Sequence, residues 1–469
     1  MSDTLLKIYH SLPAPLRSAV ANFRGLYLRS WRYGPETDRL VEEAFARENW
    51  SPQQWRTWQE ERLAYVLHRA ATQVPYYREH WAVRRRNGDQ SSWEHLENWP
   101  ILGKDTIREN PRAFVAEDCD VRKMFHEHTS GTTGKPISVW LSRDTVRNWY
   151  ALNEARVRKW NSVSRHDRWA MIGGQLVTPV NERRPPFWIW SNSLNQLYMS
   201  SYHLAPDLIR FYLDAMSHYR VTYLSGYSSS LYALALGALE LGRKDMYMTI
   251  AFTSAEPLHQ YQRDAITQAF HCSVRETYGM TEIVAAASEC ANGRKHLWPE
   301  AGWVEVVEND KSLPVGTSGE LICTGLLNAD MPLIRYRNGD RGVLARDQGT
   351  CQCGRTLPVV ESIDGRTDDL LYTMDGRQIG RLDPIFKADL PIREAQIIQE
   401  ALDCVRVRYV PTSEFKIGHE NMIIQRLQAR MGAVKVVMEP LVEVPRDANG
   451  KFRAVISKLM KKDVGSVPV

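Results

Sequence analysis

The sequence predicts an α/β fold with a β-rich subdomain, followed by a small α+β C-terminal domain. Strand-like runs such as "YMTIAFTS" and "SVRETYG" alternate with helical patterns in the middle of the chain. After Trp303 short strands and turns follow one another. The stretch "ESIDGRTDDLLYTMDGRQI" then resembles a hinge. Strands that alternate with helices favour a sheet with parallel pairing, and a run of short strands favours a separate β-rich part.

Three regions follow along the chain. Residues 1–100 form a helical N-terminal region of the large domain, rich in Trp, Arg and Glu. Residues 101–367 form its core, β-rich from about residue 303, and residues 368–469 form a small mobile domain. Within the core we expect strands at 136–142, 220–226, 247–254 and 273–279, and helices at 143–160, 211–219, 229–241 and 257–270.

Composition narrows the class of protein. The 469 residues are 43% hydrophobic and 25% charged, which is typical of a soluble globular chain with a large core. The net charge of +5 is small for a chain of this length. Proteins that bind nucleic acids usually carry a concentrated basic stripe, so we expect no nucleic-acid partner. Seven cysteines are an odd and sparse set that favours a cytoplasmic location. No apolar run reaches the roughly 18 residues of a membrane span, and Asp3 and Pro13 interrupt any signal-peptide pattern.

The N-terminal segment, residues 5–34, interleaves basic residues with large apolar ones. Such a basic amphipathic helix can pack its apolar face on the domain, as ordinary amphipathic helices do. It can also lie on an anionic membrane surface, which makes peripheral membrane contact a second possibility. The sequence leaves both open, and it does not indicate an oligomeric state.

The run "HTSGTTGKP", residues 128–136, is a candidate phosphate-binding loop. It does not match a Walker loop, because only two residues separate Gly131 from Gly134, Pro136 replaces the Ser/Thr, and a strand follows. Its hydroxyls, inward-turned backbone N–H groups and lysine can still surround a polyphosphate, although an ordinary turn has similar residues. The candidate ligands are Thr129, Ser130, Gly131, Thr132, Thr133, Gly134 and Lys135.

Four later motifs add complementary chemistry. In "TYGMTE", residues 277–282, a base can stack on Tyr278 and Glu282 can hold Mg²⁺. In "YRNGD" the carboxylate of Asp340 can bind ribose hydroxyls. "GRTDD" lies at the predicted domain boundary, and "VPRDANGKFR" brings Lys451 from the C-terminal domain.

These five motifs, in this order, resemble the adenylate-forming superfamily of acyl-CoA synthetases and peptide-synthetase adenylation domains. Segments such as "GELICTG" and "CQCGRTLPVVESIDGRTDDLL" resemble the phenylacetate–CoA ligase branch. The tail "GRQIGRLDPIFKADLPIREAQIIQ" resembles the CapK-type proteins of capsular polysaccharide clusters more closely still. Many relatives carry Thr where Asn338 and Asp447 stand, and neither change removes a charge that the chemistry needs.

The resemblance implies an AMP-forming ligase that adenylates a small carboxylic acid with ATP and Mg²⁺. It also implies transfer of the acyl group to coenzyme A or another acceptor after the small domain turns about a hinge near Asp368. Lys451, Glu282 and Thr129 are then catalytic, and Glu282 holds Mg²⁺. Besides the phosphate loop, the nucleotide-binding residues are Ser254, Ala255, Glu256, Thr277, Tyr278, Gly279, Met280, Thr281, Asp340, Arg355 and Arg366.

A second group of residues can bind a different metal. "ECANGRKH" contains Cys290 and His296, and "CQC" contains Cys351 and Cys353. Four such ligands can close a tetrahedral structural zinc site, although the spacing is not that of a zinc finger. The resemblance implies that members of the phenylacetate-ligase branch share the pattern. The alternative is that these are free cysteines in the β-rich part.

The acyl pocket is less well defined by the sequence. Phe187, Trp188 and Trp190 are candidates for its wall or for a lid, but aromatic residues fill cores equally well. We expect the acyl group near the adenine segment "SAEP", residues 254–257, and near the helix that follows "LSGYSSSLY", residues 224–232. No charged residue obviously waits for a second substrate group, so the acid is not indicated. Three roles stay open: acid ligation that supplies acyl groups for a surface polysaccharide or another acceptor; nucleotidyl transfer that stops at adenylation; and a non-catalytic scaffold.

Overall fold

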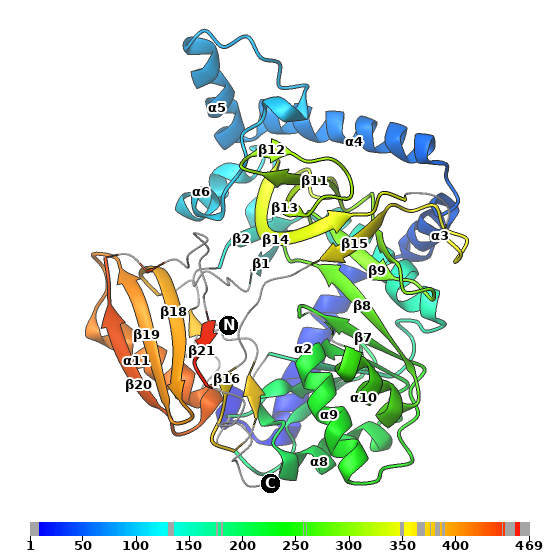
Figure 1. Cartoon of the computed structure of the whole chain (residues 1–469), viewed down its shortest axis with the longest axis vertical. Helices are drawn as coiled ribbons and strands as arrows, with labels where there is room; N and C mark the ends of the chain where they lie inside the picture. Colours follow the sequence, from blue (N-terminus) through cyan, green and yellow to red (C-terminus); the bar gives the residue numbers. More distant parts are fainter. Residues whose placement is uncertain are drawn as a thin grey trace.

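The structure is a computed structural model. It describes residues 9–129, 136–174, 177–179, 182–256, 258, 260–347, 351–363, 371–375, 377–379, 385–386, 390–442, 444–445 and 455–459. Figure 1 shows a large domain, with helices and yellow-green strands above and green strands and helices below. A smaller orange unit from the C-terminal part lies beside it. The predicted fold class, a mixed α/β domain followed by a small domain with its own sheet, is confirmed.

The described part of the first hundred residues is mainly helical. Ser51 and Gln54 form a capping box at the start of α4, with Pro52 in its first turn. Pro75 begins α5, and the helix before it ends because a residue that precedes proline is disfavoured in the α conformation. The helices are α2 (Ala14–Arg32), α3 (Thr37–Arg47), α4 (Pro52–Gln73) and α5 (Pro75–Arg86).

One half of the main sheet is parallel, as the alternating pattern predicts. Its strands lie in the order β8-β7-β6-β3-β5, with β4 antiparallel at the edge. Residues 250–253 of β7 are all buried, because helices cover such strands on both faces. The elements are β3 (Trp169–Gly173), β4 (Trp188–Ser191), β5 (Gln196–Ser200), β6 (Tyr223–Tyr227), β7 (Ile250–Ser254), β8 (Ser273–Gly279), α8 (Pro206–His218), α9 (Ser228–Glu240) and α10 (Gln260–Phe270).

The other half of the sheet is antiparallel and continues directly from the first. Strand β8 pairs in parallel with β7 on one side and antiparallel with β9 on the other, so one 13-stranded sheet results. The antiparallel part therefore begins at Ala286, ahead of the expected Trp303. Its strands are β9 (Ala286–Glu289), β10 (Lys295–Leu297), β11 (Gly302–Glu308), β12 (Lys311–Ser312), β13 (Gly319–Gly325), β14 (Tyr336–Leu344) and β15 (Val359–Ile363).

A short hairpin flanks the candidate phosphate loop. Strands β1 (Phe125–His128) and β2 (Ser138–Leu141) pair antiparallel, and His128 lies opposite Ser138 at the end nearest the loop. A strand follows the loop, which confirms the reason given for rejecting a Walker motif. Helix α6 (Lys104–Glu109) precedes the hairpin, and α7 (Arg143–Asn153) follows it after the N-cap Ser142.

The C-terminal unit has its own hydrophobic core, which includes Ile397, Val407 and Leu427. Its sheet has the order β20-β19-β18-β21, and helix α11 packs on it. The unit also touches the large domain, because Arg377 donates a hydrogen bond to the carbonyl of Tyr202. Its elements are β16 (Leu371–Tyr372), β17 (Gln378–Ile379), β18 (Ile392–Ala401), β19 (Cys404–Pro411), α11 (Ile417–Met431), β20 (Lys435–Pro440) and β21 (Val455–Ser457).

Candidate active site

A cavity of about 600 Å³ lies where the two halves of the sheet meet. The carboxyl ends of β7 and β8 border it, and β14 forms another part of its wall. Ligands of α/β sheets usually bind beyond the carboxyl ends of the strands, and this volume is in the range of ligand pockets. The predicted residues that line it are Thr129, Ser254, Ala255, Glu256, Thr277, Tyr278, Gly279, Met280, Thr281, Glu282 and Asp340.

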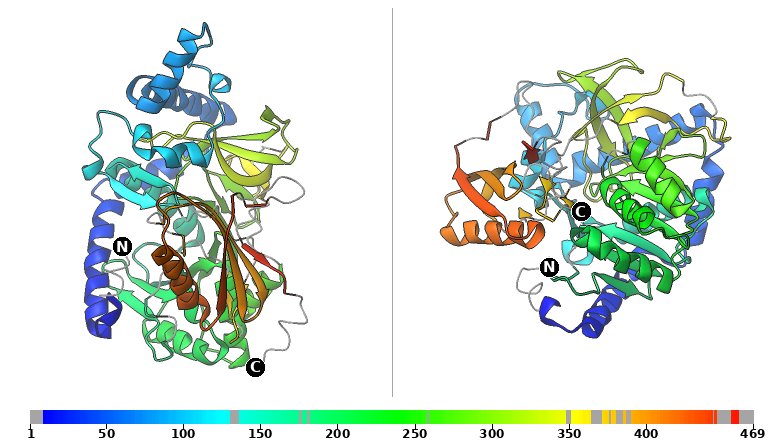
Figure 2. Two further views of the ribbon diagram at one scale, coloured as in Figure 1. Left: turned by 90° about the vertical axis from the view of Figure 1, so that its left-hand side faces the viewer. Right: turned by 60° about the horizontal axis from the view of Figure 1, so that its bottom comes forward.

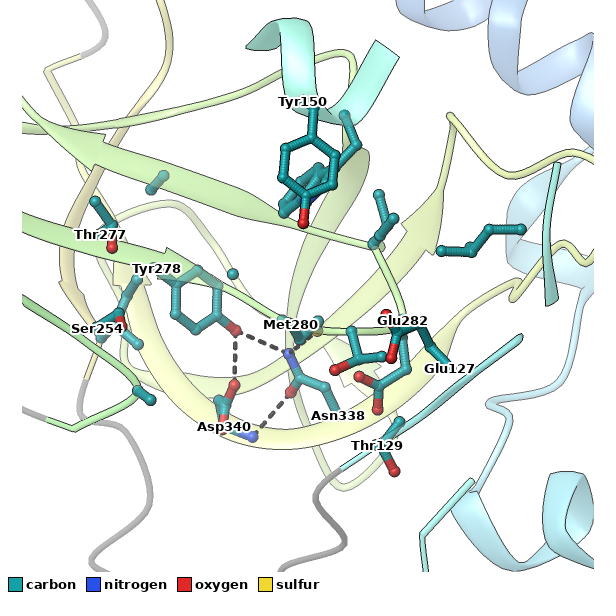
Figure 3. Close-up of a pocket in the computed structure, with 18 of the residues that line it drawn as sticks. Glu127, Thr129, Tyr150, Ser254, Thr277, Tyr278, Met280, Glu282, Asn338 and Asp340 are labelled. Carbon is teal, nitrogen blue, oxygen red and sulfur yellow. Dashed lines mark hydrogen bonds between the residues drawn. The ribbon is translucent and has the colours of Figure 1, made fainter. Parts of the chain in front are cut away.

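Tyr278, Asn338 and Asp340 form a hydrogen-bonded group in the cavity wall (Figure 3). The Tyr278 hydroxyl donates to Oδ2 of Asp340 at 2.7 Å, and Asn338 Nδ2 donates to the same hydroxyl at 2.9 Å. The Asp340 backbone N–H donates to Oδ1 of Asn338 at 2.8 Å, and Gly339 supplies the required positive φ of 91°. Burial, with the charge of Asp340, raises the pKa of Tyr278 well above its usual value. The neutral phenol thus holds the carboxylate in a fixed orientation.

Glu282 has a buried partner that the sequence did not reveal. The hydroxyl of Tyr336, on β14, donates to Oε1 of Glu282 at 2.7 Å, and the Glu282 side chain is buried while still lining the cavity. No other hydrogen bond to this carboxylate comes from the described residues. In the view of Figure 3, Glu282 and Thr129 lie on the side of the cavity opposite Ser254 and Thr277. A buried carboxylate with a remaining oxygen is a suitable ligand for a hard cation.

Thr129 closes the base of the candidate phosphate loop. Its backbone N–H donates to the carbonyl of Ile137 at 2.9 Å, and its Oγ1 accepts from the Ile137 N–H at 2.9 Å. Thr129 thus lines the cavity where the loop leaves β1. The other loop residues and the predicted residues of the hinge and lysine motifs lie outside the described part: Ser130, Gly131, Thr132, Thr133, Gly134, Lys135, Arg366, Asp368 and Lys451. Their roles stay predictions.

Glu127 and Tyr150 bring polar groups to the cavity. Neither the Glu127 carboxylate nor the Tyr150 hydroxyl forms a hydrogen bond with the described residues. Burial raises the pKa of Glu127 above its ordinary value, while the charges of Arg32 and Arg24 oppose that rise. Glu127 precedes Thr129 by two residues, so strand alternation, which places residues i and i+2 on one face, would have indicated it. Glu127 is therefore a charged residue of the cavity wall that the motifs did not identify.

The apolar part of the cavity wall includes residues of α7 and none of the predicted aromatic segment. Val146 and Trp149 of α7 line the cavity. Phe187 is fully buried and stacks on His203, and Trp188 and Trp190 pack against the same core. The core interpretation of these three aromatic residues is therefore the correct one. The cavity wall also contains no residue of α9, where we expected the acyl group.

Arg355, which was grouped with the nucleotide-binding residues, does not line the cavity. Its Nε donates to Oε2 of Glu48 at 2.9 Å, and its guanidinium lies 4.0 Å from the centre of the Trp160 ring. These contacts tie the chain after β14 to the N-terminal helices. Arg355 therefore connects separate segments of the large domain, and its side chain lies outside the cavity.

The four candidate zinc ligands come together as the sequence predicts. The ligand atoms of Cys290, His296, Cys351 and Cys353 all lie within 4.8 Å of one another. The Sγ atoms of Cys290 and Cys351 are 3.9 Å apart, and Cys353 Sγ is 3.5 Å from His296 Nε2. His296 Nδ1 is 3.0 Å from the carbonyl of Leu357, which fixes the ring so that Nε2 faces the sulfurs. This donor set fits a tetrahedral zinc ion.

Comparison with known protein families shows to which family the chain belongs. The family model described as AMP-binding enzyme matches residues 56–330, which is more than half of the chain and contains most of the cavity wall. The chain belongs to the AMP-binding enzyme family. A second model, described as the CapK C-terminal domain, matches residues 371–458, the unit that carries α11. The predicted resemblance is thereby confirmed.

Relatives of this AMP-binding chain agree with that assignment. It is 23% identical to protein CapK of Staphylococcus aureus, over 82% of this chain and 85% of that protein. It is 24% identical to the phenylacetate-coenzyme A ligase of Thermus thermophilus, over 90% of this chain and 99% of the ligase. Among solved structures, a 2-hydroxyisobutyryl-CoA ligase has a TM-score of 0.56 at 21% identity, with 88% of this chain and 91% of that chain covered. That likeness concerns the fold.

Proposed function

We propose that the chain is an ATP-dependent, AMP-forming acid ligase that transfers an acyl group to coenzyme A. One observation supports it most: the Tyr278–Asp340 pair and Glu282 share one cavity at the carboxyl ends of the sheet strands. A carboxylate held by a phenol is suited to the two hydroxyls of a ribose. Thr129, the first residue of the predicted phosphate loop, lines the same cavity.

In the first step a carboxylate oxygen of the acid attacks the α-phosphorus of ATP. A phosphorus–oxygen bond forms, the bond to the β-phosphate breaks, and pyrophosphate leaves with the electron pair. Because all reacting groups are anions, positioning and positive charge provide most of the catalysis. We assign Lys451 to the carboxylate and the α-phosphate, and Thr129, Ser130, Thr132, Thr133 and Lys135 to the leaving phosphates.

Glu282 is the residue that we propose to hold Mg²⁺. Its buried carboxylate receives a hydrogen bond from Tyr336 on one oxygen, and an oriented carboxylate is a common magnesium ligand. When bound, the ion neutralises charge on the phosphates. Glu282 thus offers the oxygen ligand that Mg²⁺ requires.

In the second step the thiol of coenzyme A loses its proton to solvent, and its sulfur attacks the acyl carbon. A thioester bond forms, the bond to the phosphate oxygen breaks, and AMP leaves. The names of the relatives support coenzyme A, because the phenylacetate-coenzyme A ligase of Thermus thermophilus aligns with 90% of this chain. A transferase that stops at adenylation remains the competing proposal. Incubation with ATP, an accepted acid and coenzyme A distinguishes them: a ligase releases AMP together with a thioester, and a transferase of that type forms no thioester.

The acid that we propose carries a hydrogen-bond donor, such as a hydroxyl or amino group, beside an apolar body. Glu127 and Tyr150 offer polar groups in the cavity, while Val146 and Trp149 provide apolar surface. A buried acceptor that stays unpaired disfavours a ligand without a donor. Exchange of radioactive pyrophosphate into ATP, with pairs of acids that differ only in one hydroxyl or amino group, tests this.

We expect the donor-bearing acid of a pair to support exchange at least tenfold faster, since a lost hydrogen bond costs about 1.5 kcal/mol or more. Glu127→Gln should reduce that preference. Equal rates for both members of every pair would contradict the acid class. The absence of exchange with all acids, while ATP still binds, would instead contradict the ligase proposal and favour the scaffold.

We further propose that the acyl group modifies a surface polysaccharide, which is the role that the resemblance of the C-terminal segment to CapK-type proteins implies. We place the reaction in the cytoplasm, where ATP and coenzyme A are available. In the described part of the chain, no helix is both long enough and apolar enough to cross a membrane.

We also propose that Cys290, His296, Cys351 and Cys353 hold a structural zinc ion. Four protein ligands leave no open position for substrate, so the ion would join β9, β10 and the chain after β14 without taking part in the reaction. Purified protein should contain about one zinc per chain by elemental analysis. Cys351→Ser should lose most of it and lower Tm by several degrees.

Cys404→Ser, in a half-buried strand position of the C-terminal unit, is the matched control and should keep both the zinc and the Tm. Parent protein without zinc would contradict this proposal. A Cys351→Ser variant that retains full zinc would do the same.

A further inference from the structure

Helix α2 carries its apolar side chains on the outside of the molecule. Leu16, Val20, Phe23 and Tyr27 are 52%, 44%, 74% and 53% exposed, and Leu26 is 54% exposed beside them. Their spacing of three and four residues places the first four in one stripe along the helix. In the left view of Figure 2, α2 runs in dark blue along an outer edge of the molecule. Of the two possibilities that the sequence left open, packing on the domain does not describe this stripe.

In the middle of α2 the side that faces the protein is small and polar, and at the C-terminal end of the helix Trp31 is buried. At Gly25 the helix lies so close to Ser191 that a Cβ atom would be 2.4 Å from the serine Oγ. Asn22 Nδ2 donates to the carbonyl of Trp190 at 3.2 Å, and the N–H of Asn192 donates to Oδ1 of Asn22 at 2.8 Å. These contacts fix the rotation of the helix. The apolar stripe is consequently held outward by the fold.

The charge of α2 indicates what the stripe meets. The helix contains Arg17, Arg24, Arg29 and Arg32 and no acidic residue, and Arg24 and Arg29 are exposed. A second copy of this helix would bring like charges together, which is unfavourable. An anionic lipid surface offers apolar depth for the stripe and negative headgroups for the arginines.

We propose that α2 docks the protein on the surface of a membrane that contains anionic lipids, with the stripe Leu16, Val20, Phe23 and Tyr27 inserted between headgroups. The helix lies in the interface and does not span it. At its C-terminal end Trp31 packs on Phe125 and the Arg32 guanidinium lies 4.5 Å from the centre of the Tyr150 ring. Because Phe125 and Tyr150 line the cavity, the catalytic cavity lies directly behind the docked helix.

Vesicle flotation of the full chain tests this inference. Vesicles of phosphatidylcholine mixed with phosphatidylglycerol should carry the protein, and pure phosphatidylcholine should carry at least tenfold less. The double variant Leu16→Ser/Phe23→Ser should bind these vesicles at least tenfold more weakly. The variant Arg24→Gln/Arg29→Gln should also bind more weakly, and its remaining binding should depend less on salt concentration. Ile417→Ser removes an equally exposed apolar side chain, 72% exposed at the start of α11, and should bind as the parent chain does.

Two outcomes would overturn the proposal. One is equal flotation of the parent chain and the Leu16→Ser/Phe23→Ser variant, provided that both have the same Tm. The other is a lipid-independent dimer, seen by analytical ultracentrifugation, that the same double variant abolishes, since the stripe would then be a contact between two copies. Pyrophosphate exchange in solution should be unchanged in the double variant, which separates docking from catalysis.

Discussion

An enzyme with Lys451 replaced by alanine is expected to form the acyl adenylate about 100- to 1,000-fold more slowly than the parent chain. The lysine would lie between two anions, the acid and the α-phosphate, at the moment when their repulsion is greatest. Removal of such a charge affects the transition state more than it affects ATP in the ground state. ATP binding, measured by calorimetry, should therefore change little while pyrophosphate exchange falls.

The same variant should still convert a chemically prepared acyl adenylate to the thioester, because the lysine acts before that step. Lys458→Ala is a suitable control, since this lysine lies seven residues further along, is 57% exposed and is 3.9 Å from Glu400. It should retain parental exchange. If Lys451→Ala exchanged at the parental rate, the lysine loop would have no part in adenylation.

The sequence predicted elements well, because periodicity reports on the local chain. The strands β6, β7 and β8 and the helices between them occur where the alternating pattern indicated. It could not predict that β8 joins the parallel and antiparallel halves, because pairing depends on residues far apart in the chain. The start of the antiparallel part was therefore expected later than Ala286, where it begins.

For the site, motifs identified residues but not their partners. Glu282 was expected to bind Mg²⁺, yet Tyr336, which holds it, is 54 residues away and belongs to another strand. Asn338 was noted only as a departure from relatives, and the structure places it between Tyr278 and Asp340. The pattern of α2 indicated an amphipathic helix, but the face it turns outward depends on the close approach of Gly25 to Ser191.

Glu282→Gln is the second substitution for which we expect a large effect, a loss of about 100-fold or more in kcat/KM for adenylation, since an ion that neutralises phosphate charge contributes several kcal/mol. The change is isosteric, so Tyr336 can still donate to the remaining oxygen and the fold should be preserved. The loss should be accompanied by a higher Mg²⁺ requirement, measured as exchange rate against Mg²⁺ concentration at fixed ATP.

Tyr336→Phe provides the matched control, because it removes the 2.7 Å hydrogen bond but keeps the negative charge of Glu282. The freed carboxylate is oriented less well, so we expect a smaller loss, about tenfold, with a modest rise in the Mg²⁺ requirement. This order distinguishes charge from orientation. If the residual activity of Glu282→Gln depended on Mg²⁺ as the parent activity does, the carboxylate would serve the architecture of the cavity through Tyr336. An equal loss in both variants would mean that the Tyr336 contact, rather than the charge, is what the reaction needs.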